Sequence, residues 1–404
     1  MRVEIAMRAL AVVLACGTAA AAPAQLATGA VCAAGRPTVK EILPASAVAG
    51  SVKILPSATG GLDVFWTGQG RVGDPHFLGM YAAFSASGQR LTRPVKLLDD
   101  PIRSVAAGGA GTFAIVHSVS TTSGWQAYVA LARPARGQIV WDVPLPSPER
   151  GHGTTHVAWD GRTRSWLVVG EELVQLPDRA PGYVYNRLFV TRLDRDGKQL
   201  EAPRYIQEPG MSASLGDWGT PLVAAGGKIA FVWAAHRDRV RTLYVTELDG
   251  DRVTHTAVAA TEAGGYMRVA IAAIAGGYAV AGGESGADPM SSRAFVTTLR
   301  DGVVAPLTYL ASARTHTSDP VVASDGARVG VAWNEDELGE PDGNRRSLVH
   351  AAVIDGQGAV HAAYDTKTPL GRHDWTSSLA WDGCRFALVH LVGINPSAVD
   401  LVRF

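Results

Sequence analysis

Histidine, aspartate, arginine and tryptophan recur in five short segments, each of which runs into a stretch of apolar residues. These segments are residues 148–156, 214–220, 264–268, 313–320 and 371–377. Imidazole titrates near neutral pH and a neighbouring carboxylate can orient it, so this mixture suits general acid–base catalysis. It also suits sugar binding, in which an indole stacks on the sugar ring and charged groups bond to its hydroxyls or carboxylate.

Nine of these side chains are candidate ligand-binding residues, and we predict that they lie on one face around one polar pocket. They are His152, Asp217, Trp218, Arg268, His316, Asp319, His373, Asp374 and Trp375. No catalytic residue is assigned. If the protein is an enzyme, the pairs His316–Asp319 and His373–Asp374 are the best acid–base candidates.

Two polysaccharide-active chemistries stay open beside simple binding. A lyase needs a histidine or tyrosine base next to an arginine that neutralises a carboxylate, which Tyr266, Arg268 and His316 would supply. A retaining glycosidase needs two carboxyl groups about 5 Å apart, drawn from the aspartates of the nine.

Several spacings that identify other sites are missing from the sequence. It has no Gly-x-Ser-x-Gly, no His-Glu-x-x-His and no glycine-rich nucleotide loop between a strand and a helix. His152 and His156 are four residues apart, but such a pair needs a helix to point both rings at one metal ion. Because they fall in a loop that runs into a strand, we expect neither a metal nor a cofactor.

A repeated turn reveals the elements that must position these side chains. A Gly-Gly or Asp-Gly pair lies between two apolar runs seven times, as in "VAWDGRTRSWLVVG" and "LAWDGCRFALVHL". The second glycines of the pairs are Gly61, Gly109, Gly161, Gly227, Gly277, Gly326 and Gly383. A period near 50 residues is typical of a repeat architecture.

Each unit carries a second phrase of the same kind, such as "TLYVTELDGDRV". An Asp-Gly pair between alternating apolar residues is a strong hairpin signal, because the tight, two-residue primed turns need a positive φ. Each unit therefore holds two hairpins, or four strands. Seven such units predict an all-β, seven-bladed β-propeller. Five tryptophans at recurring positions are expected to pack between the blades: Trp66, Trp159, Trp233, Trp333 and Trp381.

The propeller topology explains why the candidate residues should meet. The loops between second and third strands share one face with the links between blades, and the tight turns lie on the other face. The five polar segments lead into the innermost strands, so they should ring the mouth of the central channel.

The seventh unit is incomplete, because only "INPSAVDLVRF" follows its second strand. We predict that an N-terminal strand within residues 37–55, from either "VKEIL" or "SVKIL", closes the last blade. This closure would bring Cys32 near Cys384, and an oxidising compartment permits a disulfide between them. The alternative is two unpaired buried thiols.

Residues 1–24 have the features of a secretory signal peptide: an apolar run from Ala9 to Ala15 and a small-residue site at Ala22-Pro23-Ala24. "VLAC" also fits a bacterial lipobox, in which the signal ends before Cys16 and this residue carries a lipid. Residues 25–36 then form a linker and residues 37–404 a single propeller domain. The apolar run of the signal is too short to cross a bilayer, and the sequence has no other long apolar segment. We therefore expect an exported monomer that is secreted, periplasmic or anchored to the outer membrane.

The charge balance limits the partners. The chain has 37 basic and 37 acidic residues, so it has no net positive field to gather nucleic acid or anionic lipid. The expected partner is a carbohydrate or a protein.

The blades, with "VAWDG", "VVASDG" and "LAWDG" before a short apolar strand, resemble those of secreted bacterial β-propeller repeat proteins over residues 55–404. The resemblance implies an extracellular binding or glycan-related role, although such blades carry many activities. The Asp-box of sialidase-type propellers, Ser-x-Asp-x-Gly-x-Thr-Trp, is absent from the sequence. We therefore interpret the chain as a binding propeller, with a polysaccharide lyase or glycosidase as the alternative hypothesis.

Overall fold

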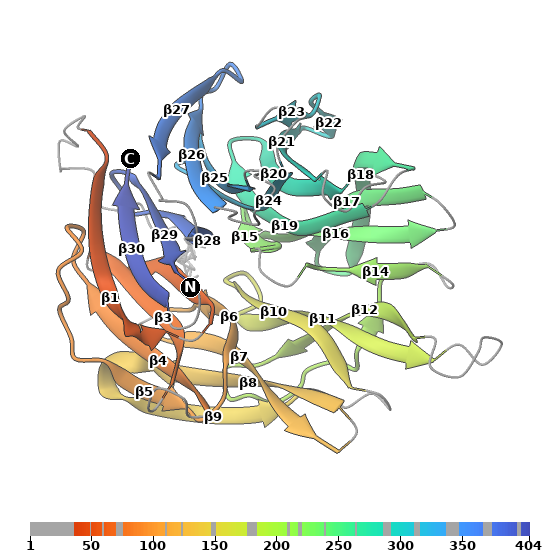
Figure 1. Cartoon of the computed structure of the whole chain (residues 1–404). Coiled ribbons are helices and arrows are strands. Elements are labelled where there is room, and N and C mark those ends of the chain that lie inside the picture. Colours follow the sequence, from red (N-terminus) through yellow and green to blue (C-terminus); the bar gives the residue numbers. More distant parts are fainter. Residues whose placement is uncertain are drawn as a thin grey trace, which may run out of the picture.

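Seven antiparallel sheets form a ring in the computed structural model, which confirms the predicted all-β, seven-bladed propeller (Figure 1). The structure describes residues 36–48, 50–58, 60–69, 76–109, 111–122, 124–146, 151–175, 184–207, 211–216, 220–237, 240–262, 265–285, 292–310, 316–336, 347–366, 374–393 and 397–404. Within these ranges, no helix is both long and apolar enough to cross a membrane. The predicted signal peptide and linker lie outside the described residues.

The first three blades each have four strands, numbered from the innermost strand outward. Blade 1 contains β2 (Val52–Pro56), β3 (Leu62–Gln69), β4 (Phe77–Phe84) and β5 (Val95–Leu98). Blade 2 contains β6 (Ile102–Ala107), β7 (Phe113–Thr121), β8 (Gly124–Arg133), the 3-10 turn η1 (Pro134–Arg136) and β9 (Gln138–Pro144). Blade 3 contains β10 (His152–Asp160), β11 (Ser165–Gln175), β12 (Val184–Leu193) and β13 (Arg204–Tyr205).

The remaining blades follow the same plan, with one strand divided in two in blades 4 and 5. Blade 4 contains β14 (Ser212–Ser214), β15 (Leu222–Ala225), β16 (Lys228–Arg237), β17 (Val240–Asp249) and β18 (Arg252–Thr261). Blade 5 contains β19 (Gly265–Ile274), β20 (Gly277–Ser285), β21 (Arg293–Arg300), β22 (Val303–Val304) and β23 (Thr308–Tyr309). Blade 6 contains β24 (His316–Ser324), β25 (Val329–Asp336), β26 (Ser347–Ile354) and β27 (Val360–Asp365). Blade 7 contains β28 (Asp374–Trp381), β29 (Phe386–Val392), β30 (Ser397–Arg403) and, outermost, β1 (Thr38–Val48).

The N-terminal strand closes the ring, as the sequence predicts. β1 pairs antiparallel with β30, with Thr38 opposite Arg403 and Leu43 opposite Val399. Figure 1 shows β1 beside β30 at the outer edge of blade 7. The closing strand contains "VKEIL", whereas "SVKIL" forms the innermost strand of blade 1.

Apolar side chains fill the spaces between blades. Each of the seven core clusters in the described part of the chain combines two neighbouring blades. Trp66, Trp233 and Trp333 are buried in such clusters, and Trp159 and Trp381 pack against them. The recurring tryptophans are therefore interblade packing residues, as predicted.

The Asp-Gly turns of blades 3, 6 and 7 owe their shape to the aspartate side chain. One carboxylate oxygen of Asp160, Asp325 and Asp382 accepts bonds from the backbone N–H groups two and three residues on, at 2.6–3.3 Å. The other oxygen pairs with an arginine, respectively Arg192, Arg328 and Arg403. These are wider Asx turns rather than the two-residue primed turns expected from the sequence.

The turn of blade 5 has no room for a side chain at Gly277. A Cβ atom at Gly277 would lie 1.9 Å from the carbonyl oxygen of Leu299, which is far inside van der Waals contact. We expect Gly277→Ala to lower the free energy of unfolding by about 2–4 kcal/mol, because the backbone of β20 must shift. Gly161→Ala is the matched control at the same turn position of blade 3, where the nearest atom is 3.9 Å away. Denaturant unfolding of both variants checks this; equal stabilities would contradict the clash.

Cys384 lies in the turn before β29 and is disulfide-bonded. The predicted partner, Cys32, lies outside the described residues. The Cys32–Cys384 pairing therefore stays a prediction, which non-reducing peptide mapping tests.

Candidate functional site

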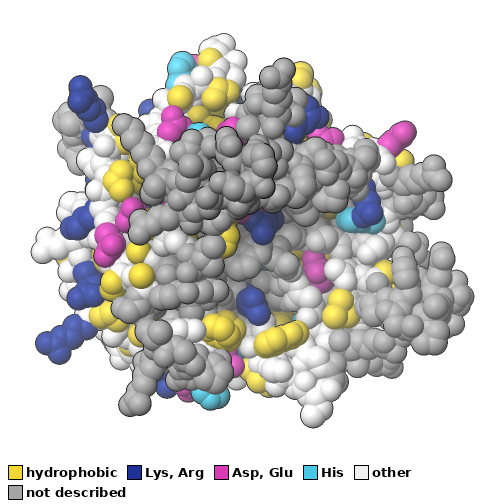
Figure 2. Space-filling view, viewed as in Figure 1, with side chains coloured by type: hydrophobic (Ala, Val, Ile, Leu, Met, Phe, Trp, Pro, Cys, Tyr) yellow, Lys and Arg dark blue, Asp and Glu magenta, His cyan; other side chains and the backbone are white. Residues whose placement is uncertain are grey.

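Two pockets open at the same end of the ring. We call this end the loop face, because the connections between second and third strands and the links between blades lie there. Pocket A has a volume of about 610 Å³ and is lined by blades 1 to 3. Pocket B has a volume of about 390 Å³ and is lined by blades 5 to 7. Figure 2 shows charged side chains of both signs near the middle of the face in view.

The β-bulges of the inner strands explain why polar side chains reach these pockets. Pairing between first and second strands shifts register near the start of β6, β10, β19, β24 and β28. The residues in the unpaired positions include six that line a pocket: Arg103, Gly153, Thr154, Arg268, Asp319 and Ser377. A bulge bends the strand and re-aims its side chains, so the same irregularity supplies both pockets.

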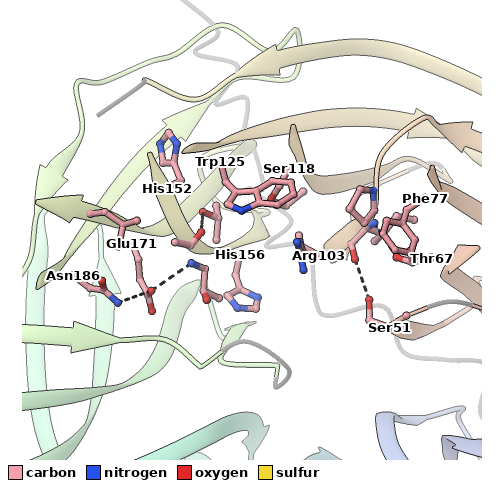
Figure 3. Close-up of a pocket in the computed structure, with 18 residues that line it drawn as sticks. Ser51, Thr67, Phe77, Arg103, Ser118, Trp125, His152, His156, Glu171 and Asn186 are labelled. Carbon is pink, nitrogen blue, oxygen red and sulfur yellow. Dashed lines mark hydrogen bonds between the residues drawn. The ribbon is translucent and has the colours of Figure 1, made fainter. Parts of the chain in front are cut away.

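Pocket A combines exposed aromatic rings with an arginine. Trp125 is the second residue of β8 and is 50% exposed, and Phe77 begins β4 and is 39% exposed. The Arg103 guanidinium carbon lies 5.9 Å from the centroid of the Trp125 ring. Figure 3 shows Arg103 in the middle of the lining, with Trp125 on one side and Phe77 and Thr67 on the other.

Two buried histidines line the same pocket and stay neutral. Burial and the nearby Lys53 ammonium lower the pKa of His156 to about 3, although the Gly216 carbonyl acts in the opposite direction. Burial also lowers the pKa of His152, against smaller effects of the Pro146 carbonyl and Glu172. Neither Nε2 atom has a hydrogen-bond partner of acceptable geometry among the described residues.

Glu171 is the one carboxylate among the described residues that line pocket A, and it holds the strands together. Its Oε2 accepts bonds from the Thr154 backbone N–H (3.4 Å) and the Asn186 side-chain amide (3.0 Å). Its Oε1 accepts a bond of 2.6 Å from the Leu215 backbone N–H, which ties blade 3 to blade 4. The carboxylate is thus engaged on both oxygens.

Pocket B is built around an ion pair. Arg268 pairs with the Asp319 carboxylate, which also accepts bonds from Ser318 Oγ (3.2 Å) and Asn334 Nδ2 (3.1 Å). Both partners of the ion pair have left-handed backbone, with φ of 53° and 54°. Strained backbone of this kind in residues other than glycine concentrates at functional sites. Trp375, 37% exposed, lines the same pocket.

The structure divides the nine predicted site residues. Arg268, Asp319 and Trp375 line pocket B, whereas His152 lines pocket A. Asp374 begins β28 and is buried. The backbone of His316 begins β24, and its side chain lies outside the described part of the structure, as do all of Asp217, Trp218 and His373.

The tyrosine of the lyase hypothesis does not line pocket B among the described residues. Tyr266 is buried against Phe295, with ring centroids 5.9 Å apart, and is not among the described residues that line pocket B. The register of β19 shifts between Met267 and Ala270, so Arg268 lies in the bulge and Tyr266 lies before it. Burial, reinforced by the charge of Glu284, raises the pKa of Tyr266, which makes it a poor base.

Sequence reasoning missed Arg103, Trp125 and Phe77. Arg103 lies in the link between blades 1 and 2, "DDPIRS", which is equivalent to the five polar segments and could have been found by the same topological argument. Trp125 follows the polar run "STTSG" at the start of a third strand, a position on the loop face. Nothing in the sequence singles out Phe77.

Comparison with known proteins finds distant likenesses to solved structures. No protein-family model matches the chain, and no curated protein sequence matches it. A Trypanosoma rangeli sialidase superposes with a TM-score of 0.46 and 10% identity, over 92% of this chain and 60% of the sialidase. A Pyrococcus horikoshii acylaminoacyl peptidase gives 0.49 and 11%, over 89% of this chain and 52% of the peptidase. An acylaminoacyl peptidase bound to a chloromethyl ketone gives 0.50 and 10%, over the same shares of the two chains.

These likenesses concern the propeller scaffold alone, because the identities are so low. The chain spans about 60% of the length of the sialidase and about half of each peptidase. The seven-bladed propeller is established, and the resemblance to secreted bacterial repeat proteins stays a prediction.

Proposed function

We propose that the protein is an exported β-propeller that binds a glycan at pocket A. The observation that carries the proposal is the half-exposed Trp125 ring beside Arg103, at a cavity on the loop face. The five tryptophans at recurring positions pack between blades, whereas the Trp125 ring lines a cavity of about 610 Å³. A flat, exposed ring next to a hydrogen-bond donor suits a sugar, whose apolar face stacks while its hydroxyls bond.

The single carboxylate that the described residues supply to pocket A favours binding over hydrolysis. A glycosidase of the usual kind needs two carboxyl groups that flank the scissile bond. Among the described lining residues, Glu171 supplies one, and both of its oxygens already accept hydrogen bonds. This argues for recognition without cleavage at pocket A.

A polysaccharide-active enzyme with its site at pocket B is the second candidate. The left-handed backbone of Arg268 and Asp319 favours a functional role there. Incubating the purified protein with each glycan that it binds, and measuring new reducing ends and unsaturated products, separates the two candidates. New products would favour the enzyme, and their absence would favour the binding protein.

Removing the exposed indole tests the site. We expect Trp125→Ala to weaken glycan affinity about 5- to 100-fold, because stacking on one aromatic ring contributes ~1–3 kcal/mol in the analogous case of bases. Thermal stability should change little, because half of the ring already lies in solvent. Titration calorimetry with a hit from a glycan array measures the affinity.

Trp375→Ala is the matched control, because this ring has a similar exposure but lines pocket B. We expect its affinity to equal that of the unaltered protein. An effect of Trp375→Ala without one of Trp125→Ala would move the site to pocket B. Failure of every glycan on the array would contradict the proposal.

Export is part of the proposal and has its own test. We expect residues 1–24 to direct the chain out of the cytoplasm, or Cys16 to carry a lipid after cleavage before it. Mass spectrometry of the mature N-terminus distinguishes these two products. An uncleaved chain recovered from the cytoplasm would contradict both.

A further inference from the structure

Arg103 has an unusual position for an arginine in this protein. Its side chain is exposed at the start of β6, yet it has no ion pair within the part of the chain that the structure describes. Its guanidinium lies over the Trp125 ring instead. Arg268, its counterpart at the bulge of β19, is neutralised by Asp319. Pocket A therefore presents a cation that its described neighbours leave uncompensated.

The buried histidines next to Arg103 are neutral, so they add no positive charge to pocket A. His152 is 4% exposed and His156 is 3% exposed, and both line pocket A. The Ala127 backbone N–H donates to His152 Nδ1 at 3.4 Å, so the ring proton resides on Nε2. Both Nε2 atoms are shielded from solvent, so a ligand in pocket A meets the rings as neutral walls. Arg103 is the one arginine or lysine among the described residues that line the pocket.

We propose that pocket A selects the carboxylated sugar of an acidic polysaccharide: Arg103 binds the carboxylate, and Trp125 stacks on the sugar ring. This inference rests on the proposed function and narrows its ligand class. A planar guanidinium can donate two parallel bonds to a carboxylate, which a neutral sugar cannot accept in the same way. Glu171 does not oppose the arrangement strongly, because three N–H donors already stabilise its charge.

Pocket B differs from pocket A because its arginine is already paired. Arg268 pairs with the Asp319 carboxylate, which also accepts a bond from the side-chain amide of Asn334. A second anion would have to displace Asp319 from Arg268, which lies in a strained backbone that holds the pair in place. Selectivity for acidic sugars should therefore reside in pocket A alone.

The test compares ligands that differ only in charge. Oligogalacturonate, the same oligosaccharide after reduction of its carboxyl groups, and a sulfated but carboxylate-free oligosaccharide of equal length are titrated into the protein. We expect the uronate to bind at least ~10-fold more tightly than the reduced form, since a hydrogen bond to a charged group contributes about this much. It should also bind more tightly than the sulfated chain, whose tetrahedral groups fit the planar guanidinium less well.

Variants assign the charge effect to one residue. Arg103→Gln should remove the difference between the uronate and its reduced form, and Arg103→Lys should retain only part of it. Arg328→Gln is the matched control, because Arg328 also lies over a tryptophan, Trp381 at 5.6 Å, but in a tight turn on the opposite face. This control should bind as the unaltered protein does.

The remaining outcomes decide against the proposal. Equal binding of the uronate and its reduced form, with both lost in Trp125→Ala, would overturn carboxylate selection and leave glycan binding at pocket A intact. Equal binding of uronate and sulfated chains would show a general anion site and overturn it as well. Failure of all three ligands, and of every glycan on the array, would remove the proposed function together with this inference.

Discussion

A chain that lacks residues 36–48 is expected to fail to fold into a soluble monomer. These residues include β1, whose Ile42, Leu43 and Val48 are buried in the cluster between blades 7 and 1. Burying each such side chain contributes ~1.5–3 kcal/mol, so their sum is comparable to the whole net stability of a typical domain, about 5–15 kcal/mol. The deletion also exposes β30 as an unpaired edge, which promotes aggregation. Solubility and circular dichroism of the expressed protein measure the effect.

A circular permutant separates the role of the strand from that of the N-terminus. Thr38 lies opposite Arg403, so a short turn can join Phe404 to Thr38. A chain that begins at Gly50 and ends with residues 38–48 after this turn should recover the fold. It also lacks Cys32, so its recovery would assign closure to strand pairing rather than to the disulfide. A soluble, cooperative deletion chain, or a permutant that stays unfolded, would contradict the closure.

Acid is expected to destabilise the protein through two buried histidines. Burial lowers the pKa of His390 to about 4, and burial with the Lys53 charge lowers that of His156 to about 3, from an ordinary value near 6.5. The unfolded chain therefore binds these protons first. The stability contribution is complete above about pH 6.5 and falls as the pH drops toward 4 and 3, by up to ~1.4 kcal/mol per pH unit for each group. Urea unfolding at steps from pH 7.5 to pH 4 measures the slope.

His156→Gln and His390→Gln each remove one titrating group from the folded and the unfolded chain. Each variant should flatten the fall in the free energy of unfolding over this range, and the double variant should flatten it further. His361→Gln is the matched control, because its ring is exposed and bonded to Asp355. Slopes that stay the same in both buried variants would show that other groups control the response to acid.

The fold could be predicted from the sequence because its signals are local and repeated. A turn pair between apolar runs recurs every 50 residues or so, and the missing outer strand of the last unit points to the N-terminus. The detail of the turns was less accessible. Asp160, Asp325 and Asp382 accept backbone bonds in wider loops. Arg328 completes its turn from three residues away, but Arg192 and Arg403 come from positions that only the fold brings near.

The candidate site could be predicted only as a location. Topology places the links between blades on one face, and this put Arg268, Asp319 and Trp375 in one pocket. The bulges that aim Arg103 and Asp319 toward the channel mouth depend on pairing register, which no local pattern announces. The sequence suggested one pocket, whereas the structure places His152 in pocket A and Arg268, Asp319 and Trp375 in pocket B.

A crystal structure of the protein with bound oligogalacturonate would show directly where an acidic sugar binds. We expect one sugar in pocket A, with its ring against Trp125 and its carboxylate on Arg103, and no sugar between Arg268 and Trp375. Bound sugar in pocket B, or on the face that carries the tight turns, would contradict the assignment of the site.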